Sequence, residues 1–354
     1  MEKIRTGLVG YGLSGQVFHA PFLHANPRFD LSMVMERSKN LAKNIYPYTE
    51  RVNSYEQVIE DDSIELVIIT TPNNLHYEMV QRALLNGKHV LVEKPFTISS
   101  CEGYELARLA EEQKKVLTVY HNRRWDGDFL TVKSLLDQGM LGKPAAYEAH
   151  FDRFEKNLST DAWREKDLPG SGIVYDLGSH LIDQALTLFG VPKEVSADID
   201  IQREGGAADD AFAIRLYYPE LTAVLKSGML VREPGPRFQV HGSNGSYVKY
   251  GIDPQEERLG AGRMPDDEEI GSENEELWGI LNTDISGLHY RGRVETIPGQ
   301  YMAFYDGLYR SIRNEEEPPV LAEEAADVIK IIECAKISAA EKRTVSFSKE
   351  QAAE

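Results

Sequence analysis

The stretch Ile4-Arg-Thr-Gly-Leu-Val-Gly-Tyr-Gly-Leu-Ser-Gly15 decides the fold of this chain. It begins as a short apolar run with β-branched residues at Ile4 and Val9, which predicts a strand. It ends in the pattern Gly10-x-Gly12-x-x-Gly15, after which residues 16–24 can continue as a helix. A strand, a glycine turn and a helix in this order place a pyrophosphate at a helix N-terminus, so the stretch predicts a dinucleotide-binding unit.

The three glycines have separate tasks in such a unit. Gly10 permits the tight turn, Gly12 lets the backbone approach the phosphates, and Gly15 allows the helix to pack closely on the strand. In a chain with 28 glycines among 354 residues, chance alone gives this spacing roughly 0.2 times, so the pattern by itself also fits an ordinary glycine-rich turn. Its place at the first strand of a β-α-β succession favours dinucleotide binding.

Length, charge and cysteine content narrow the class of protein. A length of 354 residues predicts two domains, and a net charge of −18 argues against nucleic acid or anionic membranes, whose phosphates demand Lys and Arg. No apolar run approaches the roughly 20 residues needed to span a bilayer, and residues 1–5 run straight into the first strand, so we expect no signal peptide. Cys101 and Cys334 lie far apart and lack the spacing of a metal site. We therefore expect a cytoplasmic protein.

The choice between NAD and NADP depends on the end of the second predicted strand, Phe29–Glu36. Glu36 lies 21 residues after the last motif glycine, about where a carboxylate accepts a hydrogen bond from the ribose 2′-OH of NAD. Arg37, Ser38 and Lys39 follow at once, and their guanidinium, hydroxyl and ammonium groups suit the 2′-phosphate of NADP. A solvated strand end is the alternative. The segment favours NADP over NAD, provided that Glu36 points away from the phosphate.

The rest of the first half alternates apolar strands with helices. We expect strands at Ile64–Thr71, Lys88–Val92 and Val116–Tyr120, and helices at residues 76–86 and 101–113. This succession is typical of a doubly wound parallel sheet, whose ligands gather at the carboxyl ends of the strands. Lys94, in Glu93-Lys94-Pro95, follows one such strand. Its ammonium could polarise an alcohol or carbonyl oxygen beside a nicotinamide, or it could be an ordinary exposed lysine.

The pattern changes near Tyr120–Arg123, where we place the boundary between domains of residues 1–121 and 122–354. Consecutive strands without intervening helices then indicate a mostly antiparallel sheet. These strands are expected at Ala145–Phe154, Val195–Gln202, Ala211–Tyr217, Thr222–Met229 and Phe238–His241. The acidic stretch Asp253–Glu276 is predicted to be a solvated excursion without a catalytic part. A helix over Pro319–Glu341 and a short strand around Thr344–Phe347 end the chain.

A glycine-rich loop and helix at residues 170–189 carry a second group of candidate residues. Asp176, His180 and Asp183 are spaced i, i+4 and i+7, so they line one helix face. A carboxylate and an imidazole one turn apart can form an acid–base unit. Taken alone, the pattern favours a polar stripe that faces water. A metal site is a third alternative, although a site led by a lysine needs no metal.

Together these motifs resemble the glucose–fructose oxidoreductase/inositol dehydrogenase (Gfo/Idh/MocA) family over essentially the whole chain. The resemblance rests on residues 10–15, on Thr71-Pro72-Asn73 with His76, on Glu93-Lys94-Pro95 and on Asp176-Leu-Gly-Ser-His180. Two finer segments, 120–126 and 235–253, look like the bacterial NADP-dependent scyllo-inositol dehydrogenases. The resemblance implies an α/β fold, with a Rossmann domain and a C-terminal α+β domain. The latter has a large, mostly antiparallel open sheet, which commonly joins homodimers or homotetramers.

The resemblance also implies which residues act. Lys94, Asp176 and His180 match the catalytic lysine, aspartate and histidine of the family and are implied to contact the substrate. Arg124 and Asp126 are further candidates for substrate contacts. The implied cofactor contacts, besides Lys94, are Gly10, Gly12, Leu13, Ser14, Gly15, Glu36, Arg37, Ser38, Thr71, Pro72, Asn73, His76, Glu93, Trp163 and Arg164, and no metal is implied.

The expected reaction is hydride transfer between a cyclitol or sugar hydroxyl carbon and a nicotinamide. His180 is expected to take the hydroxyl proton, because an imidazole has an ordinary pKa of about 6.5. Lys94 would stabilise the developing oxygen charge, and Asp176 would orient and assist both. An aldose 1-dehydrogenase shares every motif, and a non-catalytic NADP-sensing regulator shares the fold. Retention of all three residues, and the lack of a DNA-binding segment in the sequence, favour an enzyme.

Overall fold

The computed structural model describes residues 2–159 and 165–349, and the chain forms two compact units. The first comprises Met1–Trp125, Pro254–Ile270 and Gln300–Ala326. The second comprises Asp126–Asp253, Gly271–Gly299 and Asp327–Glu354. The first cut lies close to the boundary expected at residue 121, but two later stretches return to the first unit. A single boundary therefore does not describe the division.

The first unit is built on a parallel sheet of six strands in the order β3-β2-β1-β4-β5-β6. Its strands are β1 (Ile4–Val9), β2 (Phe29–Met35), β3 (Glu50–Val52), β4 (Leu66–Ile69), β5 (His89–Val92) and β6 (Leu117–Val119). Every residue of β4 is apolar and buried, as in a strand covered on both faces. The doubly wound parallel sheet is thereby confirmed. Its order reverses between β1 and β4, where such sheets bind their ligands.

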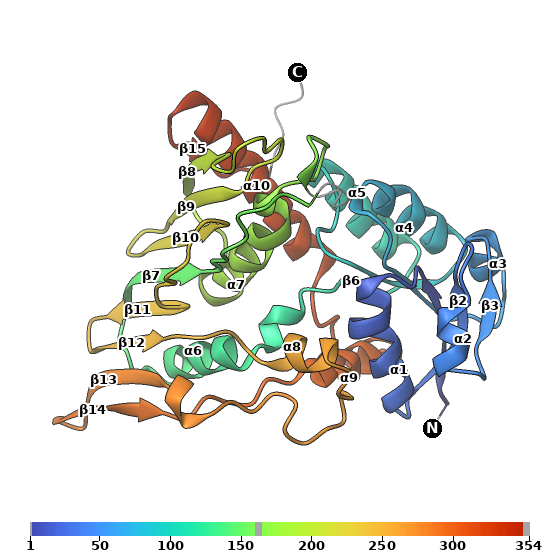
Figure 1. The fold of residues 1–354 in the computed structure, drawn as a ribbon, viewed down its shortest axis with the longest axis horizontal. Coiled ribbons are helices and arrows are strands. Elements are labelled where there is room, and N and C mark those ends of the chain that lie inside the picture. Colours follow the sequence, from blue (N-terminus) through green and yellow to red (C-terminus); the bar gives the residue numbers. More distant parts are fainter. Residues whose placement is uncertain (1, 160–164, 350–354) are drawn as a thin grey trace. The chain divides into compact units, whose positions relative to one another are not determined.

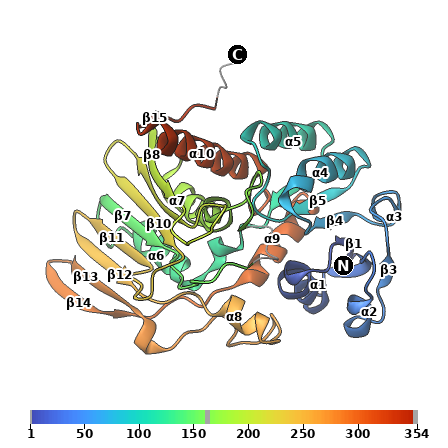
Figure 2. The same cartoon turned by 45° about the horizontal axis from the view of Figure 1, so that its top comes forward.

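Helices cover both faces of this sheet, and Figure 2 shows α1 and α2 on one side with α4 and α5 on the other. The helices are α1 (Ala20–Ala25), α2 (Leu41–Ile45), α3 (Glu56–Ile59), α4 (His76–Leu85) and α5 (Ser100–Glu112). Ser99 caps α5 by accepting a hydrogen bond from the amide of Glu102, whose carboxylate accepts one from the amide of Ser99. The elements α2, β3 and α3 were not predicted from the sequence, because elements this short show no periodicity.

The two later stretches of the first unit contribute α8 (Gln255–Gly260) and α9 (Tyr301–Ile312). The ring of Tyr305 in α9 stacks on Phe22 with centroids 5.1 Å apart. Asp306 accepts a hydrogen bond from Arg28 at 2.5 Å. Since Phe22 and Arg28 flank the end of α1, α9 is part of the packing around the first helix rather than an appendage of the second unit.

The second unit is built on a nine-stranded sheet in the order β14-β13-β12-β11-β7-β10-β9-β8-β15. Its strands are β7 (Pro144–His150), β8 (Glu194–Asp200), β9 (Ala211–Tyr217), β10 (Thr222–Gly228), β11 (Phe238–Gly242), β12 (Gly245–Lys249), β13 (Gly279–Ile285), β14 (Leu288–Val294) and β15 (Val345–Ser346). Among the described residues only β7 and β10 pair in parallel. The mostly antiparallel sheet is confirmed, although β12, β13 and β14 were not predicted from the sequence.

Helices lie on one face of the nine-stranded sheet (Figure 1). They are α6 (Gly127–Asp137), α7 (Ser179–Phe189) and the part of α10 (Ala322–Glu341) that belongs to the second unit. In β10, Ala223 and Leu225 are fully buried, whereas the alternating Val224 and Lys226 are half-buried. This alternation gives the sheet one apolar face and one more polar face. No helix within residues 2–159 and 165–349 is long and apolar enough to cross a membrane.

The prediction that Asp253–Glu276 is only a solvated excursion is wrong at both ends. Asp253 is buried, and its carboxylate accepts a hydrogen bond from the amide of Gly127 at 2.7 Å, at the start of α6. Glu273 forms an ion pair of 2.9 Å with Lys249, which is fully buried. Acidic composition cannot reveal such pairs, because the partners are remote in sequence.

Candidate active site

The glycine turn after β1 has the shape that the motif predicts. Gly10 has φ +101°, and a Cβ there would lie 2.7 Å from Thr70 Oγ1. A Cβ on Gly15 would lie 2.6 Å from the carbonyl oxygen of Gly10. A Cβ on Gly12 would meet nothing within 4 Å. The fold itself therefore requires Gly10 and Gly15, whereas Gly12 borders open space.

Glu93, at the carboxyl end of β5, connects the glycine turn with Lys94. Its carboxylate accepts hydrogen bonds from the Ser14 hydroxyl and from the Lys94 amide, the latter at 3.0 Å. The ring Nε2 of His19, which is fully buried, lies 2.9 Å from the same carboxylate. Burial raises the pKa of Glu93, but the His19 and Ser14 hydrogen bonds outweigh it and hold that pKa below its usual range. Ser14 and Glu93, both predicted cofactor contacts, thus bond to each other.

His76 links the carboxyl ends of β4 and β5. Its ring is almost fully buried, with Nε2 2.9 Å from the carbonyl oxygen of Thr71 and Nδ1 3.0 Å from that of Pro95. Burial lowers the pKa of His76, against the opposing effect of these carbonyl groups. Asn73 is also buried, whereas Pro72 is exposed. The motif residues therefore lie just after the carboxyl end of β4; they are Thr71, Pro72, Asn73 and His76. The ring of His76 is enclosed by protein.

The carboxylate of Glu36, directly after β2, points to the start of the following helix, α2. Its two carboxylate oxygens accept hydrogen bonds from the amides of Leu41 and Ala42, both at 3.0 Å, at the start of α2. The side chain is buried, whereas Arg37 and Ser38 are exposed. The Glu36 carboxylate is thus turned to backbone donors, while the side chains of Arg37 and Ser38 are exposed.

These residues fit a dinucleotide. The open space at Gly12 leaves room for phosphates against the turn, where backbone amides and the helix N-terminus favour negative charge. Leu13, beside the turn, is 72% exposed, an apolar surface that a bound nucleotide would cover. Arg37 is exposed, and its guanidinium is a hydrogen-bond donor suited to a phosphate of the dinucleotide.

In the second unit, Asp176 and His180 lie on a turn of π-helix, η5 (Val174–Gly178), and on α7. His180 and Asp183 are 4% and 1% exposed, and Asp176 is half-buried. A polar stripe facing water is therefore the wrong interpretation. The His180 ring is stacked near Phe151, with centroids 6.5 Å apart. Across residues 2–159 and 165–349, no three or more His, Cys, Asp or Glu side chains are grouped to hold a metal.

The remaining predicted residues fall in different places. Arg124 forms an ion pair with Glu324 at 3.0 Å, within the first unit. Asp126 is fully buried and opens the second unit just before α6. Trp163 and Arg164 lie outside the described residues. Lys94, which is half-buried, belongs to the first unit and the Asp176–His180 pair to the second.

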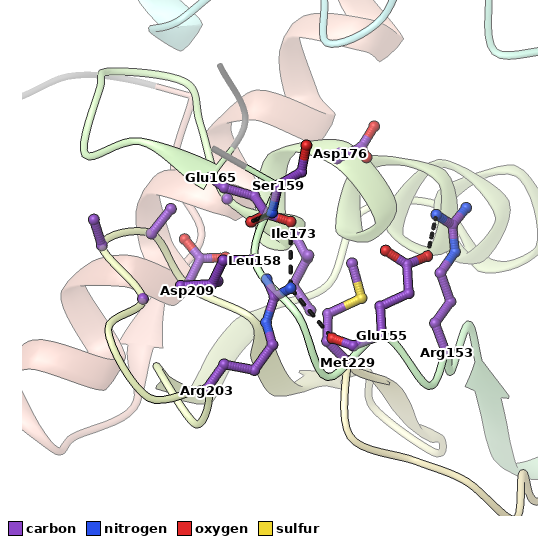
Figure 3. Close-up of a pocket in the computed structure, with 14 residues that line it drawn as sticks. Arg153, Glu155, Leu158, Ser159, Glu165, Ile173, Asp176, Arg203, Asp209 and Met229 are labelled. Carbon is purple, nitrogen blue, oxygen red and sulfur yellow. Dashed lines mark hydrogen bonds and ion pairs between the residues drawn. The ribbon is translucent and has the colours of Figure 1, made fainter. Parts of the chain in front are cut away.

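Asp176 borders a polar cavity of about 170 Å³ in the second unit (Figure 3). Its charged lining residues are Arg153, Glu155, Glu165, Asp176, Arg203 and Asp209. Arg203 donates hydrogen bonds to Glu165 at 3.2 Å and to Asp210 at 2.9 Å, so its charge is already neutralised. Carboxylates outnumber arginines on this wall, which makes it suited to hydroxyl groups rather than to an anion.

Sequence reasoning missed three residues that surround the candidate site residues, one in the first unit and two in the second. They are His19, Arg203 and Asp209. Each acts on a partner at least 7 positions away, and none falls in a motif. Only the adjacent acids at 209 and 210, in a loop between two predicted strands, offer a signal in the sequence.

A parallel dinucleotide-binding sheet, a phosphate-ready glycine turn and a strand-edge lysine define a nicotinamide-nucleotide-dependent oxidoreductase. Comparison with known proteins agrees with this class. The chain belongs to the Gfo/Idh/MocA oxidoreductase family. The family model described as the NAD-binding Rossmann fold matches residues 4–121, and that of the C-terminal alpha/beta domain matches residues 133–347. The enzyme is thus an NAD(P)-dependent dehydrogenase.

Individual relatives are similar over nearly the whole chain. The scyllo-inositol 2-dehydrogenase (NADP(+)) IolW of Bacillus subtilis is 44% identical over 348 residues, which cover 98% of this chain and 96% of the relative. An uncharacterized oxidoreductase of Escherichia coli, YdgJ, is 41% identical over 98% of this chain and 99% of its own length. Among solved structures, the oxidoreductase YvaA of Bacillus subtilis superposes with a TM-score of 0.95 at 42% identity, covering 98% of this chain and 99% of its own.

Proposed function

We propose that this protein is an NADP-dependent dehydrogenase of a cyclitol such as scyllo-inositol, with Lys94, Asp176 and His180 as its catalytic residues. The observation that carries the proposal is the anchoring of Glu93. Its carboxylate accepts hydrogen bonds from the hydroxyl of Ser14, in the glycine turn, and from the backbone amide of Lys94, the latter at 3.0 Å. The turn that would hold the phosphates and the lysine that would meet the substrate thus belong to one bonded assembly.

The preference for NADP is supported by the environment of Glu36. Two backbone amides occupy its carboxylate, so it is not oriented to accept a hydrogen bond from a ribose 2′-hydroxyl. Arg37 and Ser38 remain exposed and are suited to a 2′-phosphate. The printed name of the 44% identical relative includes NADP, which points the same way.

In this mechanism the residues of the chain move one proton and stabilise one charge. When bound, the nicotinamide supplies the hydride acceptor or donor. His180 takes the proton of the substrate hydroxyl during oxidation and returns it during reduction. Lys94 stabilises negative charge on the substrate oxygen, and Asp176, one turn before His180, orients both. The burial of His180 keeps its ring away from bulk water.

An aldose oxidised at C1 is the competing substrate class, because it would use the same three residues. An assay at the absorbance band of reduced nicotinamide separates the two, with NAD and NADP each offered against a panel of inositols and aldoses. We expect turnover with NADP and an inositol. Turnover with aldoses alone would overturn the cyclitol assignment while keeping the dehydrogenase.

We further propose that the more polar face of the nine-stranded sheet joins two or four copies of the chain. Val224 on this face is half-buried beside charged neighbours of β7 and β9, so it is an apolar side chain within a polar surface. Light scattering of the purified protein tests this, with Val224→Glu as the variant that should shift the oligomer toward the monomer. The cytoplasmic location expected from the two thiols, neither of which is in a disulfide, remains part of the proposal.

A further inference from the structure

We propose that Asp209 is a positioning residue that fixes the start of the helical segment carrying Asp176 and His180. This inference rests on the proposed function for its catalytic consequence. It concerns a loop of the second unit, residues 201–210 between β8 and β9. All the contacts that carry it lie within that unit.

Asp209 holds the first two residues of the segment through two hydrogen bonds. Its Oδ1 accepts from the amide of Val174 at 2.8 Å, and its backbone carbonyl accepts from the amide of Ile173 at 3.0 Å. These amides belong to the first turn of a helix, where no partner exists within the helix itself. Asp209 therefore caps a segment 35 positions earlier in the chain. Asp176 follows two residues after the bonded Val174.

The loop that presents Asp209 is itself fastened. The carboxylate of Asp210 accepts hydrogen bonds from the amides of Gln202 and Arg203 at 2.6 and 3.0 Å, and from Arg203 Nε at 2.9 Å. Both Arg203 and Asp210 are buried. Because the loop is closed on itself in this way, the position of Asp209 does not depend on its contacts with the helix start alone.

Gly172 provides independent evidence that this contact is tightly fitted. It has φ +85°, and a Cβ there would lie 2.1 Å from an oxygen of the Asp209 carboxylate. Glycine at 172 thus makes the room that the carboxylate occupies. Burial raises the pKa of Asp209, and the Val174 amide opposes the rise, so the contact also influences the charge on the cavity wall.

The test compares Asp209→Ala with Asp209→Asn, since an asparagine oxygen can still accept from the Val174 amide. In Asp209→Ala we expect amide exchange to rise at least about tenfold across residues 173–180. We expect kcat with the inositol substrate to fall about 10- to 100-fold, because small misplacements of reacting groups are costly. NADPH affinity, measured by fluorescence, should stay unchanged. Asp209→Asn should restore most of both losses.

Ser338→Ala is the matched control. Ser338 is buried in the same unit and accepts a hydrogen bond from the amide of Ala197 at 3.0 Å, but it does not line the cavity. The Ser338→Ala substitution should lower thermal stability without lowering kcat or raising amide exchange at residues 173–180. Equal losses in this variant and in Asp209→Ala would mean a merely structural role and would overturn the proposal.

Gly172→Ala supplies a second route to the same displacement. It should reproduce the kinetic loss in the native background and add less when Asp209 is already alanine, because the clash with the carboxylate is then gone and only the strain of the positive φ remains. Fully additive effects would contradict the proposal, as would an Asp209→Asn variant as impaired as Asp209→Ala. If the native protein turns over no inositol, the proposed function fails, while the exchange measurements still decide whether Asp209 anchors the helix start.

Discussion

His19 Nε2 lies 2.9 Å from the carboxylate of Glu93, which also accepts hydrogen bonds from Ser14 of the glycine turn and from the amide of Lys94. The other ring nitrogen of His19 lies 2.9 Å from the hydroxyl of Tyr305. The residue that directly precedes α1, the end of β5 and the distant helix α9 therefore share one buried polar network. Such networks are rigid only when every member has its partner.

Removing the Glu93 carboxylate should destabilise the protein. Glu93→Ala leaves His19 and Ser14 without their acceptor, at a cost of about 2–4 kcal/mol. The lowered pKa of Glu93 sets the pH dependence: its contribution is present above the ordinary glutamate pKa of about 4.3 and is lost as pH falls through the lower, folded-state pKa. Urea unfolding should therefore show the gap between native protein and Glu93→Gln narrowing below about pH 4. A gap that is constant with pH would contradict this.

Alanine substitutions at the three glycines of the turn should affect stability and cofactor binding differently. Gly10→Ala and Gly15→Ala place a methyl group within 2.7 Å of existing atoms, so they should lower stability by about 2 kcal/mol or more. Gly12→Ala meets nothing within 4 Å and should leave thermal unfolding unchanged. It should nevertheless weaken NADPH binding about tenfold or more, because the methyl group enters the phosphate space. Equal NADPH affinity in Gly12→Ala and native protein would rule out this location for the phosphates.

Lys94→Ala and His180→Ala should each lower kcat by about 10²- to 10⁴-fold, the range of a lost acid–base or charge-stabilising group. NADPH binding should remain nearly native in both. Lys3→Ala, at an exposed position of the same unit as Lys94, serves as the control for a lost surface charge. Normal turnover in both variants would contradict the assignment of Lys94 and His180 as catalytic residues.

Arg37→Ala should change the choice of cofactor. Losing one guanidinium contact to a phosphate should reduce kcat/KM for NADP about tenfold and leave the value for NAD nearly unchanged. Lys43→Ala, another exposed cation of the same unit, is the control. A loss shared equally by both cofactors would place Arg37 away from the 2′-phosphate.

The ion pairs of His150 should make the stability of the protein depend on pH near neutrality. Its ring nitrogens lie 2.8 and 3.0 Å from the carboxylates of Glu148 and Asp152, and Lys226 pairs with Glu148 from β10. Burial lowers the pKa of His150, but the two carboxylates outweigh it and the pKa is raised. The stabilisation is therefore complete below about pH 6.5 and is lost as pH rises through the folded-state pKa.

Denaturant unfolding at several pH values tests this contribution. Native protein should lose about 0.5 kcal/mol relative to His150→Gln between pH 6 and pH 8, the size expected of a partly exposed ion pair. Parallel curves for the two proteins over that range would show that the cluster does not titrate.

Local patterns allowed the sequence to predict the sheet core and the main motifs. The run around β4 and the glycine turn need only neighbouring residues, so they were recognisable. The orientation of Glu36 was not, because it depends on α2, a helix of 5 residues without a periodic signal. The roles of Asp209 and Asp253 depend on amides 35 and 126 positions away, which composition alone cannot indicate.

The segment that supplies Tyr305 imposes an order on biosynthesis. The nucleotide-binding unit begins at the N-terminus but receives its last elements from residues 300–326. While the chain grows on the ribosome, Phe22 and His19 lack the aromatic ring and hydroxyl that later cover them. The unit therefore cannot mature before most of the second unit has been synthesised. A fragment ending at residue 125 would leave an apolar surface open to chaperones.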